Sequence, residues 1–143
     1  MTIRKLGRKK EHRERTLRNL ATSLVLYEKV ITTEAKAKAV ISLVERLFTR
    51  VRRDELSGRR HAKSVLFDTN AVSKLIDDLV KRQGTRTSGF VRITKLQPRK
   101  GDGAPMAQIE LLLTPLEELI QAETQTKVRV RKSTVKAPEE VAV

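Results

Sequence analysis

The feature that most constrains this chain is an apolar stripe with helical spacing in its first half. Its members recur every three or four residues over about four turns of helix: Ala37, Val40, Ile41, Val44, Leu47, Phe48 and Val51. A helix with one apolar face must bury that face against other elements. We therefore expect the central helix of the core here, with Thr33 as its N-cap and Glu34 beside the positive helix end.

Three more helices are predicted from the same periodicity, over residues 13–27, 60–67 and 70–82. Residues 54–58 look like a connection between two of them. Asn70 is expected to be an N-cap, and Gly84 is placed to end the last of these helices in a left-handed conformation.

Strand-forming residues dominate after Gly84. Residues 89–96 favour a strand, and residues 106–113 alternate in polarity, with one apolar face made of Ala107, Ile109, Leu111 and Leu113. Joined by residues 97–105, they predict an antiparallel hairpin, while the β-branched residues 30–33 predict a short strand or extended link. Because a lone hairpin is marginal in water, the expected fold is α+β, with about four helices packed on a small sheet in two layers.

Length and periodicity indicate one domain with a tail at each end. The chain has 143 residues, a usual length for one domain. We expect a basic N-terminal arm at residues 1–12, a single α+β domain at residues 13–122, and a mobile tail at residues 123–143, where periodicity is lost. Within the domain, Thr114 and Glu117 form a capping-box pair that predicts a last short helix to about Ala122.

The charge balance points to a polyanionic partner. The chain carries 31 Lys and Arg against 17 Asp and Glu, a formal net charge of +14. Neutralising phosphates releases condensed counterions, so nucleic acid fits such a chain best. One tyrosine, three phenylalanines and no tryptophan offer little surface for base stacking. Contacts are therefore expected on phosphate and sugar, by a protein that reads the shape of a folded RNA.

The positive charge is concentrated at residues 1–20, 41–62 and 84–104. Residues 105–123 hold four Glu and neither Lys nor Arg, so this stretch should face solvent or protein. The candidate RNA-binding residues come from the three basic clusters: Arg4, Lys5, Arg8, Lys9, Lys10, Arg13, Arg15, Arg18, Arg59, Arg60, Arg86, Arg92, Arg99 and Lys100.

Catalytic and metal-binding patterns are weak. Cysteine is absent, and neither His12 nor His61 has a second histidine at ligand spacing. Asp77 and Asp78 are adjacent, so on a helix they point about 100° apart, and a two-metal site would need further acids. The glycines around Asp102 lack the following Gly-Lys-Ser/Thr of a phosphate-binding loop. We predict a binding protein that is not an enzyme and uses no metal, cofactor or small-molecule substrate.

Membrane association is not expected either. No apolar run approaches the roughly 20 residues needed to cross a bilayer, and the first residues lack the apolar core of a signal peptide. The sequence predicts a soluble, unexported protein.

Several ordered motifs resemble one known family. These are residues 4–8 (RKLGR), 17–25 (LRNLATSLV), 31–38 (ITTEAKAK), 89–93 (GFVRI) and 101–111 (GDGAPMAQIEL). They are similar to successive motifs of bacterial large-subunit ribosomal protein seventeen. The segment between the first two motifs is a few residues shorter than that family's pattern, and residues 114–143 match no part of it.

The resemblance implies an α+β structural component of the large ribosomal subunit in the cytoplasm. It implies binding to 23S ribosomal RNA near the polypeptide exit region, and neighbouring large-subunit proteins, among them protein thirty-two. It places the RNA-facing arm on Arg4, Lys5, Arg8 and the start of the first helix, and a basic hairpin face on Arg92, Arg99 and Lys100. The residues alone leave open an alternative, an architectural DNA- or RNA-binding protein outside the ribosome.

Overall fold

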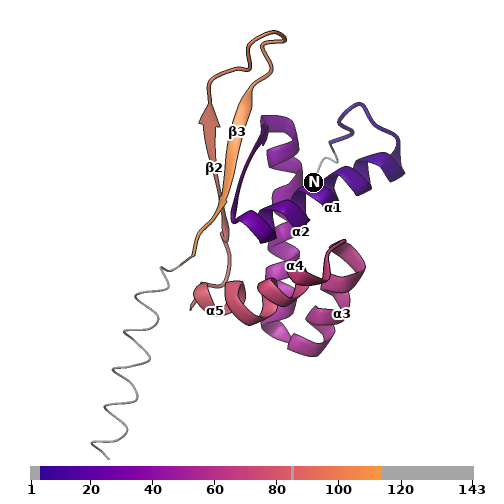
Figure 1. Cartoon of the computed structure of the whole chain (residues 1–143), viewed down its shortest axis with the longest axis vertical. Helices are drawn as coiled ribbons and strands as arrows, with labels where there is room; N and C mark the ends of the chain where they lie inside the picture. Colours follow the sequence, from indigo (N-terminus) through magenta and orange to yellow (C-terminus); the bar gives the residue numbers. More distant parts are fainter. Residues whose placement is uncertain (1–3, 85, 114–143) are drawn as a thin grey trace, which may run out of the picture. The chain divides into compact units, whose positions relative to one another are not determined.

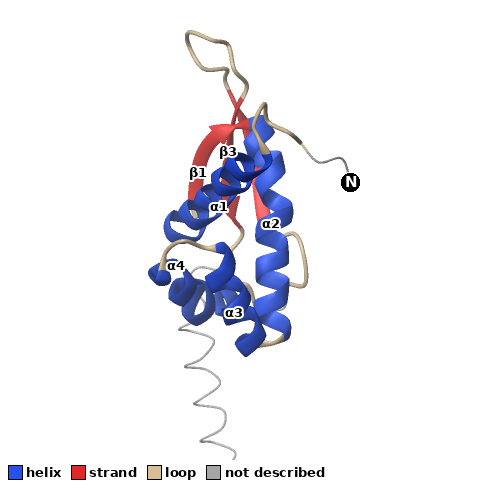
Figure 2. Cartoon of the chain, turned by 90° about the vertical axis from the view of Figure 1, so that its right-hand side faces the viewer, coloured by secondary structure: helices blue, strands red, loops and turns tan. Residues whose placement is uncertain are grey.

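The computed structural model describes residues 4–84 and 86–113. Helices cover one face of a small antiparallel sheet, as Figures 1 and 2 show from two directions. In chain order the elements are α1 (Lys10–Tyr27), β1 (Lys29–Thr33), α2 (Glu34–Arg53), α3 (Glu55–Val65), α4 (Thr69–Lys74), η1 (Leu75–Leu79), α5 (Val80–Arg82), β2 (Val91–Leu96) and β3 (Met106–Leu111). The predicted α+β class is confirmed. The predicted helix at residues 115–122 and the tail at residues 123–143 lie outside the described residues.

The sheet has the order β1-β3-β2, so the last strand in sequence is the central one. Residues 30–33, predicted as a strand or a link, belong to β1, which pairs with β3 through Val30 opposite Ile109. On the other side β2 places Ile93 opposite the same Ile109. The predicted alternation in β3 is confirmed, because Ala107, Ile109 and Leu111 are buried. These three side chains face the helices and not solvent.

The core forms where α2 crosses the inner face of the sheet. Its stripe is buried as predicted at Ala37, Val40, Val44, Leu47, Phe48 and Val51, while Ile41 is half-buried. The rings of Phe48 and Phe90 have centroids 5.5 Å apart, so α2 is joined to the residue that precedes β2. Aromatic pairs at this distance add to the free energy of area burial.

Helix caps are where local prediction failed most often. Thr33 precedes α2 as expected, but its side chain makes no capping hydrogen bond. Asp54 is the single non-helical residue between α2 and α3, and it caps α3. Its carboxylate accepts a hydrogen bond from the backbone N–H of Leu56 at 3.1 Å. The predicted connection at residues 54–58 is therefore wrong, because four of its five residues begin α3.

The helical run of residues 69–82 also starts at a different residue from the one predicted. Its N-cap is Asp68, whose carboxylate accepts from the backbone N–H of Asn70 at 2.9 Å, so the prediction of Asn70 as the cap was wrong. A π-helical turn, η1, interrupts the run and brings Leu75, Ile76 and Leu79 together into the core. Gly84 has φ +55°, the predicted left-handed conformation after the helix.

Candidate nucleic-acid interface

The predicted N-terminal arm, residues 1–12, ends earlier than expected, because α1 begins at Lys10 and not at Arg13. The described residues before the helix, 4–9, contain a tight turn. Leu6 and Gly7 both have positive φ, 55° and 60°, and the backbone N–H of Arg8 donates to the carbonyl of Lys5 at 3.1 Å. A residue with a Cβ, such as Leu6, rarely adopts a positive φ. The guanidinium of Arg8 supports the turn by donating to the carbonyl of Leu6 at 3.1 Å. The turn leaves Arg4 and Lys5 exposed.

The first turn of α1 is positively charged and has no side-chain cap. Lys9 is the N-cap residue and makes no capping bond, and Glu11 is the only acid of the first turn. Lys10 is exposed and Arg13 is half-buried at the same end. Cations beside the positive end of a helix are unfavourable, whereas a bound anion there is stabilised by the free N–H groups. This helix start is thus suited to a phosphate.

The arm, the start of α2 and the loop end of the hairpin come together around Glu34. Its carboxylate forms an ion pair with Lys38 and lies 3.9 Å from the ammonium of Lys95 on β2. The hydrogen bond from Lys38 lowers the pKa of Glu34, and the charges of Lys95 and Arg4 lower it further. The backbone N–H of Glu34 also donates to the carbonyl of Pro105 at 2.9 Å. Basic residues from three distant parts of the chain therefore act on the same carboxylate. Figure 2 shows the start of α2 close to the hairpin loop.

The basic hairpin residues predicted for RNA are in part neutralised. Arg99 holds Asp102 through two hydrogen bonds, Nε to Oδ1 at 3.0 Å and Nη2 to Oδ2 at 2.5 Å. These bonds, with one from the backbone N–H of Ala104, lower the pKa of Asp102 to about 2. Arg92 lies 3.4 Å from Glu110 across the strands, and Lys100 is exposed. The hairpin tip is thus held in shape by one of its own cations.

The remaining predicted residues lie on other elements. Arg59 of α3 forms ion pairs with Glu55 at 3.3 Å and with Asp77 at 3.9 Å, while Arg60 next to it is exposed. Arg86 donates to the carbonyl of Gly89 at 3.3 Å. Within residues 4–84 and 86–113, the predicted residues without an ion pair or side-chain hydrogen bond are Arg4, Lys5, Lys9, Lys10, Arg13, Arg15, Arg18, Arg60 and Lys100.

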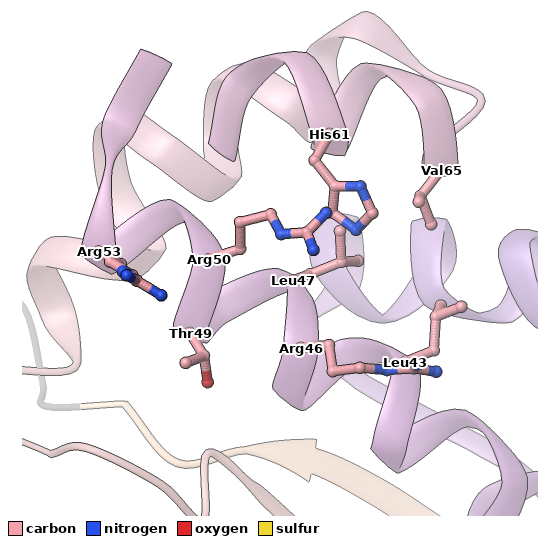
Figure 3. Close-up of a pocket in the computed structure, with 8 residues that line it drawn as sticks. All are labelled: Leu43, Arg46, Leu47, Thr49, Arg50, Arg53, His61 and Val65. Atoms are coloured by element: carbon pink, nitrogen blue, oxygen red, sulfur yellow. The ribbon is translucent and has the colours of Figure 1, made fainter. Parts of the chain in front are cut away.

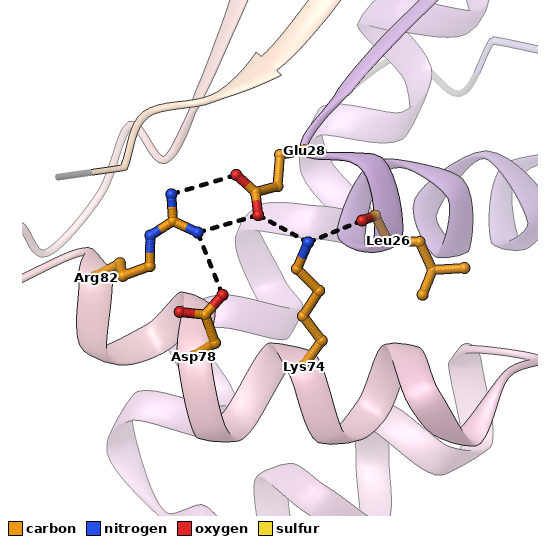
Figure 4. A network of polar contacts seen from close by, with 5 residues as sticks. All are labelled: Leu26, Glu28, Lys74, Asp78 and Arg82. Atoms are coloured by element: carbon orange, nitrogen blue, oxygen red, sulfur yellow. Dashed lines mark hydrogen bonds and ion pairs between the residues drawn. The ribbon is translucent and has the colours of Figure 1, made fainter. Parts of the chain in front are cut away.

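Other cations hold the fold instead. Glu28 ends α1 with φ 62° and accepts Lys74 at 2.7 Å and Arg82 at 3.0 and 3.3 Å (Figure 4). Arg82 also reaches Asp78 at 3.2 Å, and Lys74 donates to the carbonyl of Leu26 at 2.8 Å. Burial alone would raise the pKa of Glu28, but the hydrogen bonds from Lys74 and Arg82 outweigh it, and the pKa is lowered. This network joins the end of α1 to the helical run of residues 69–82.

A basic groove between α2 and α3 contains residues that sequence reasoning missed. Figure 3 shows its lining: Leu43, Arg46, Leu47, Thr49, Arg50, Arg53, His61 and Val65. The cluster at residues 41–62 was recognised, but its candidates were taken from Arg59 and Arg60. The spacing of Arg46, Arg50 and Arg53, four and three residues apart, places them on one helix face and could have identified them.

The described part of the chain adds no sign of other chemistry. It contains no group of three or more His, Asp or Glu side chains arranged to hold a metal ion. None of its helices has the length and hydropathy needed to span a membrane.

Comparison with known proteins identifies one family. Residues 16–112 match the family model described as "Ribosomal protein L17". The chain is 46% identical over 112 residues to "Large ribosomal subunit protein bL17" of Caldanaerobacter subterraneus subsp. tengcongensis, covering 78% of this chain and 100% of that protein. The protein of the same name from Carboxydothermus hydrogenoformans is 46% identical, with 76% and 96% covered. That from Solibacter usitatus is 50% identical, with 76% and 72% covered.

Proposed function

Because the chain belongs to the ribosomal protein L17 family, we propose that it binds 23S ribosomal RNA as a structural constituent of the large ribosomal subunit. The family consists of structural ribosomal components and not of enzymes, in agreement with the binding role predicted from the sequence. Family membership also favours this role over the architectural protein outside the ribosome that the residues alone left open.

The observation that carries the proposal is the set of exposed cations around the uncapped start of α1. Arg4, Lys5, Lys9 and Lys10 are exposed and make no ion pair with the described residues. The Nε of Arg8 is buried there without a hydrogen-bond partner in the described part of the chain. In the free protein this arrangement brings like charges and a positive helix end together, and a cation in the first turn, such as Lys10, costs roughly 0.3–1 kcal/mol. Bound RNA phosphates would replace these repulsions with attractions.

The contacts fall mainly on phosphate and sugar. Two of the phenylalanines, Phe48 and Phe90, are fully buried in the core and cannot stack on bases. Tyr27 and Phe67 are exposed, but a single aromatic at each place does not form a stacking platform. Binding through the backbone of a folded RNA follows from this composition.

The family resemblance implies where in the large subunit the protein lies and which protein it contacts. We infer a position near the polypeptide exit region and a contact with large-subunit protein thirty-two. Lysine-directed cross-linking of purified subunits, read by mass spectrometry, tests this contact. Cross-links confined to proteins far from the exit region would contradict it.

A matched pair of variants tests the arm. R4Q/K5Q/K10Q removes three exposed cations from the arm and α1, and R52Q/K63Q/K81Q removes three exposed cations elsewhere. The arm variant should lower the log–log slope of 23S RNA affinity against salt by about 2–3, at roughly 0.7–0.9 per contact. The control variant should change it much less. Equal slopes for the two variants would contradict the assignment of the arm.

Sedimentation tests the ribosomal role itself. In a sucrose gradient of lysate at moderate salt, the protein should migrate with the large subunit. If it stayed at the top of the gradient while other ribosomal proteins sedimented, the proposed role would be wrong.

A further inference from the structure

The groove between α2 and α3 combines a small apolar floor with a basic rim. Leu43, Leu47 and Val65 form the floor, and its volume of about 460 Å³ lies within the range of small-ligand sites. Arginines of α2 and His61 of α3 form the rim (Figure 3). In this view the guanidinium of Arg50 lies next to the imidazole of His61, so a cation of α2 and a hydrogen-bonding group of α3 border the same space.

The three arginines of the rim have no acidic partner. Among the described residues, none of Arg46, Arg50 and Arg53 has a carboxylate within 4.0 Å. Within residues 4–84 and 86–113, the one side-chain hydrogen bond that these arginines donate runs from Nε of Arg46 to the carbonyl of Ser42 at 2.9 Å. Like charges one helical turn apart repel each other by a few tenths of a kcal/mol. An anion in the groove would turn this repulsion into attraction.

The helix dipole explains only part of this arrangement. Arg50 and Arg53 belong to the last turn of α2, where cations stabilise the negative helix end. The same argument covers Arg52, which is not among the residues that line the groove. It does not account for Arg46, which lies one turn earlier, or for the histidine facing the arginines from another helix.

The state of His61 agrees with a site built for an anion. Burial lowers the pKa of His61, and the charges of Arg50 and Arg46 lower it further. The neutral imidazole keeps one N–H donor, and a phosphate beside it would also stabilise the protonated form. The charged groups that act on His61 are thus arginines of α2, and an anion bound in the groove would offset their effect.

We propose that the α2–α3 groove binds the phosphodiester backbone of a ribosomal RNA segment, through Arg46, Arg50 and Arg53 with His61. This inference rests on the proposed function and adds a second contact to it. Planar guanidinium forks match phosphate oxygens bidentately, and their repetition along one helix face suits the repeated phosphates of a strand. The apolar floor can cover the carbon side of a ribose.

The groove is separate from the arm. Arg50 follows Glu34, where the arm approaches α2, by sixteen residues, which corresponds to about 24 Å along the helix. One short RNA element cannot occupy both places as a single phosphate cluster. The protein therefore joins two RNA segments, or two distant parts of one segment, across the length of α2.

The test compares R46Q/R50Q/R53Q with the control R52Q/K63Q/K81Q, which removes the same charge from exposed positions that do not line the groove. Affinity for 23S ribosomal RNA is measured as a function of salt, and circular dichroism melts verify that both variants fold. The groove variant should lower the log–log slope by about 2–3, against little change for the control. In parallel, phenylglyoxal labelling of the parent protein should show Arg46, Arg50 and Arg53 protected by RNA.

Each outcome has one meaning. If the parent protein fails to bind 23S RNA, the proposed function itself is wrong. If the parent binds and the groove variant behaves like the control, with its arginines labelled equally in the presence and absence of RNA, the groove inference is overturned. Normal binding to free RNA combined with weaker incorporation into subunits would also overturn it, and would point to an acidic segment of a neighbouring protein.

Discussion

Gly58 marks the closest approach of two helices, and its replacement by alanine tests how tightly they are packed. A Cβ added to Gly58 of α3 would lie 2.4 Å from the Cα of Val51, 2.9 Å from its nitrogen and 3.0 Å from its Cγ2. Ordinary contacts of a Cβ begin at about 3.4 Å. Because two of these atoms are backbone, no rotamer change relieves the clash, and α3 must move away from α2 by about 1 Å.

The magnitude follows from two opposing terms. Overpacking costs about 1–3 kcal/mol, and a clash with backbone belongs at the upper end of that range. Alanine is a better helix former than glycine by about 1 kcal/mol. The net loss for Gly58→Ala is therefore about 2 kcal/mol, or a fall in Tm of roughly 8 °C for a domain of this size.

Thermal unfolding by circular dichroism measures this loss. Ser57→Ala is the matched control, since Ser57 is exposed on the same helix and the substitution should stabilise by about 0.5 kcal/mol at most. A local readout is available from His61, whose lowered pKa should rise toward its ordinary value by NMR titration as α3 moves away from α2. A Gly58→Ala protein that melts at or above the parent temperature would refute the reasoning, because helix propensity would then outweigh packing.

Three further predictions concern single residues. Glu28→Gln should destabilise the protein near neutral pH. The pKa of Glu28 is lowered in the folded state, so the stabilisation from its carboxylate is present above about pH 4.5 and is lost as pH falls through the folded pKa. The melting temperatures of parent and variant should therefore converge in acid. A gap that stayed constant down to pH 3 would contradict this. Val44→Asp should abolish cooperative unfolding, because Val44 is fully buried and an unpaired charge cannot be accommodated there; a parent-like melt would show that the inner face of α2 is misassigned. Asp102→Asn should release Arg99 and steepen the salt dependence of RNA binding with little change in Tm, whereas weaker binding would show that the paired loop itself is required.

Local sequence patterns predicted most elements because they depend on neighbouring residues alone. The stripe of α2, the alternation of β3 and the left-handed Gly84 follow from helical period, strand period and the freedom of glycine at positive φ. The misplaced boundaries were at caps. Asp54 and Asp68 have several possible roles in the sequence, and only the path of the chain around them decides which N–H their carboxylates accept from.

The sequence by itself determined that this chain folds around an amphipathic helix and presents a strongly basic surface, since composition and periodicity are properties of short segments. The tertiary structure alone decided which cations are paired with acids and which are available to an anionic partner. Arg82 pairs with Glu28 across 54 residues, and Arg59 reaches Asp77 from another helix, so these two are occupied while the arm is not. It also decided that Arg46, Arg50 and Arg53 of α2 line one groove with His61 of α3. Ion pairs and grooves require distant segments to come within a few ångströms, and that proximity results from packing the core, which no local pattern encodes.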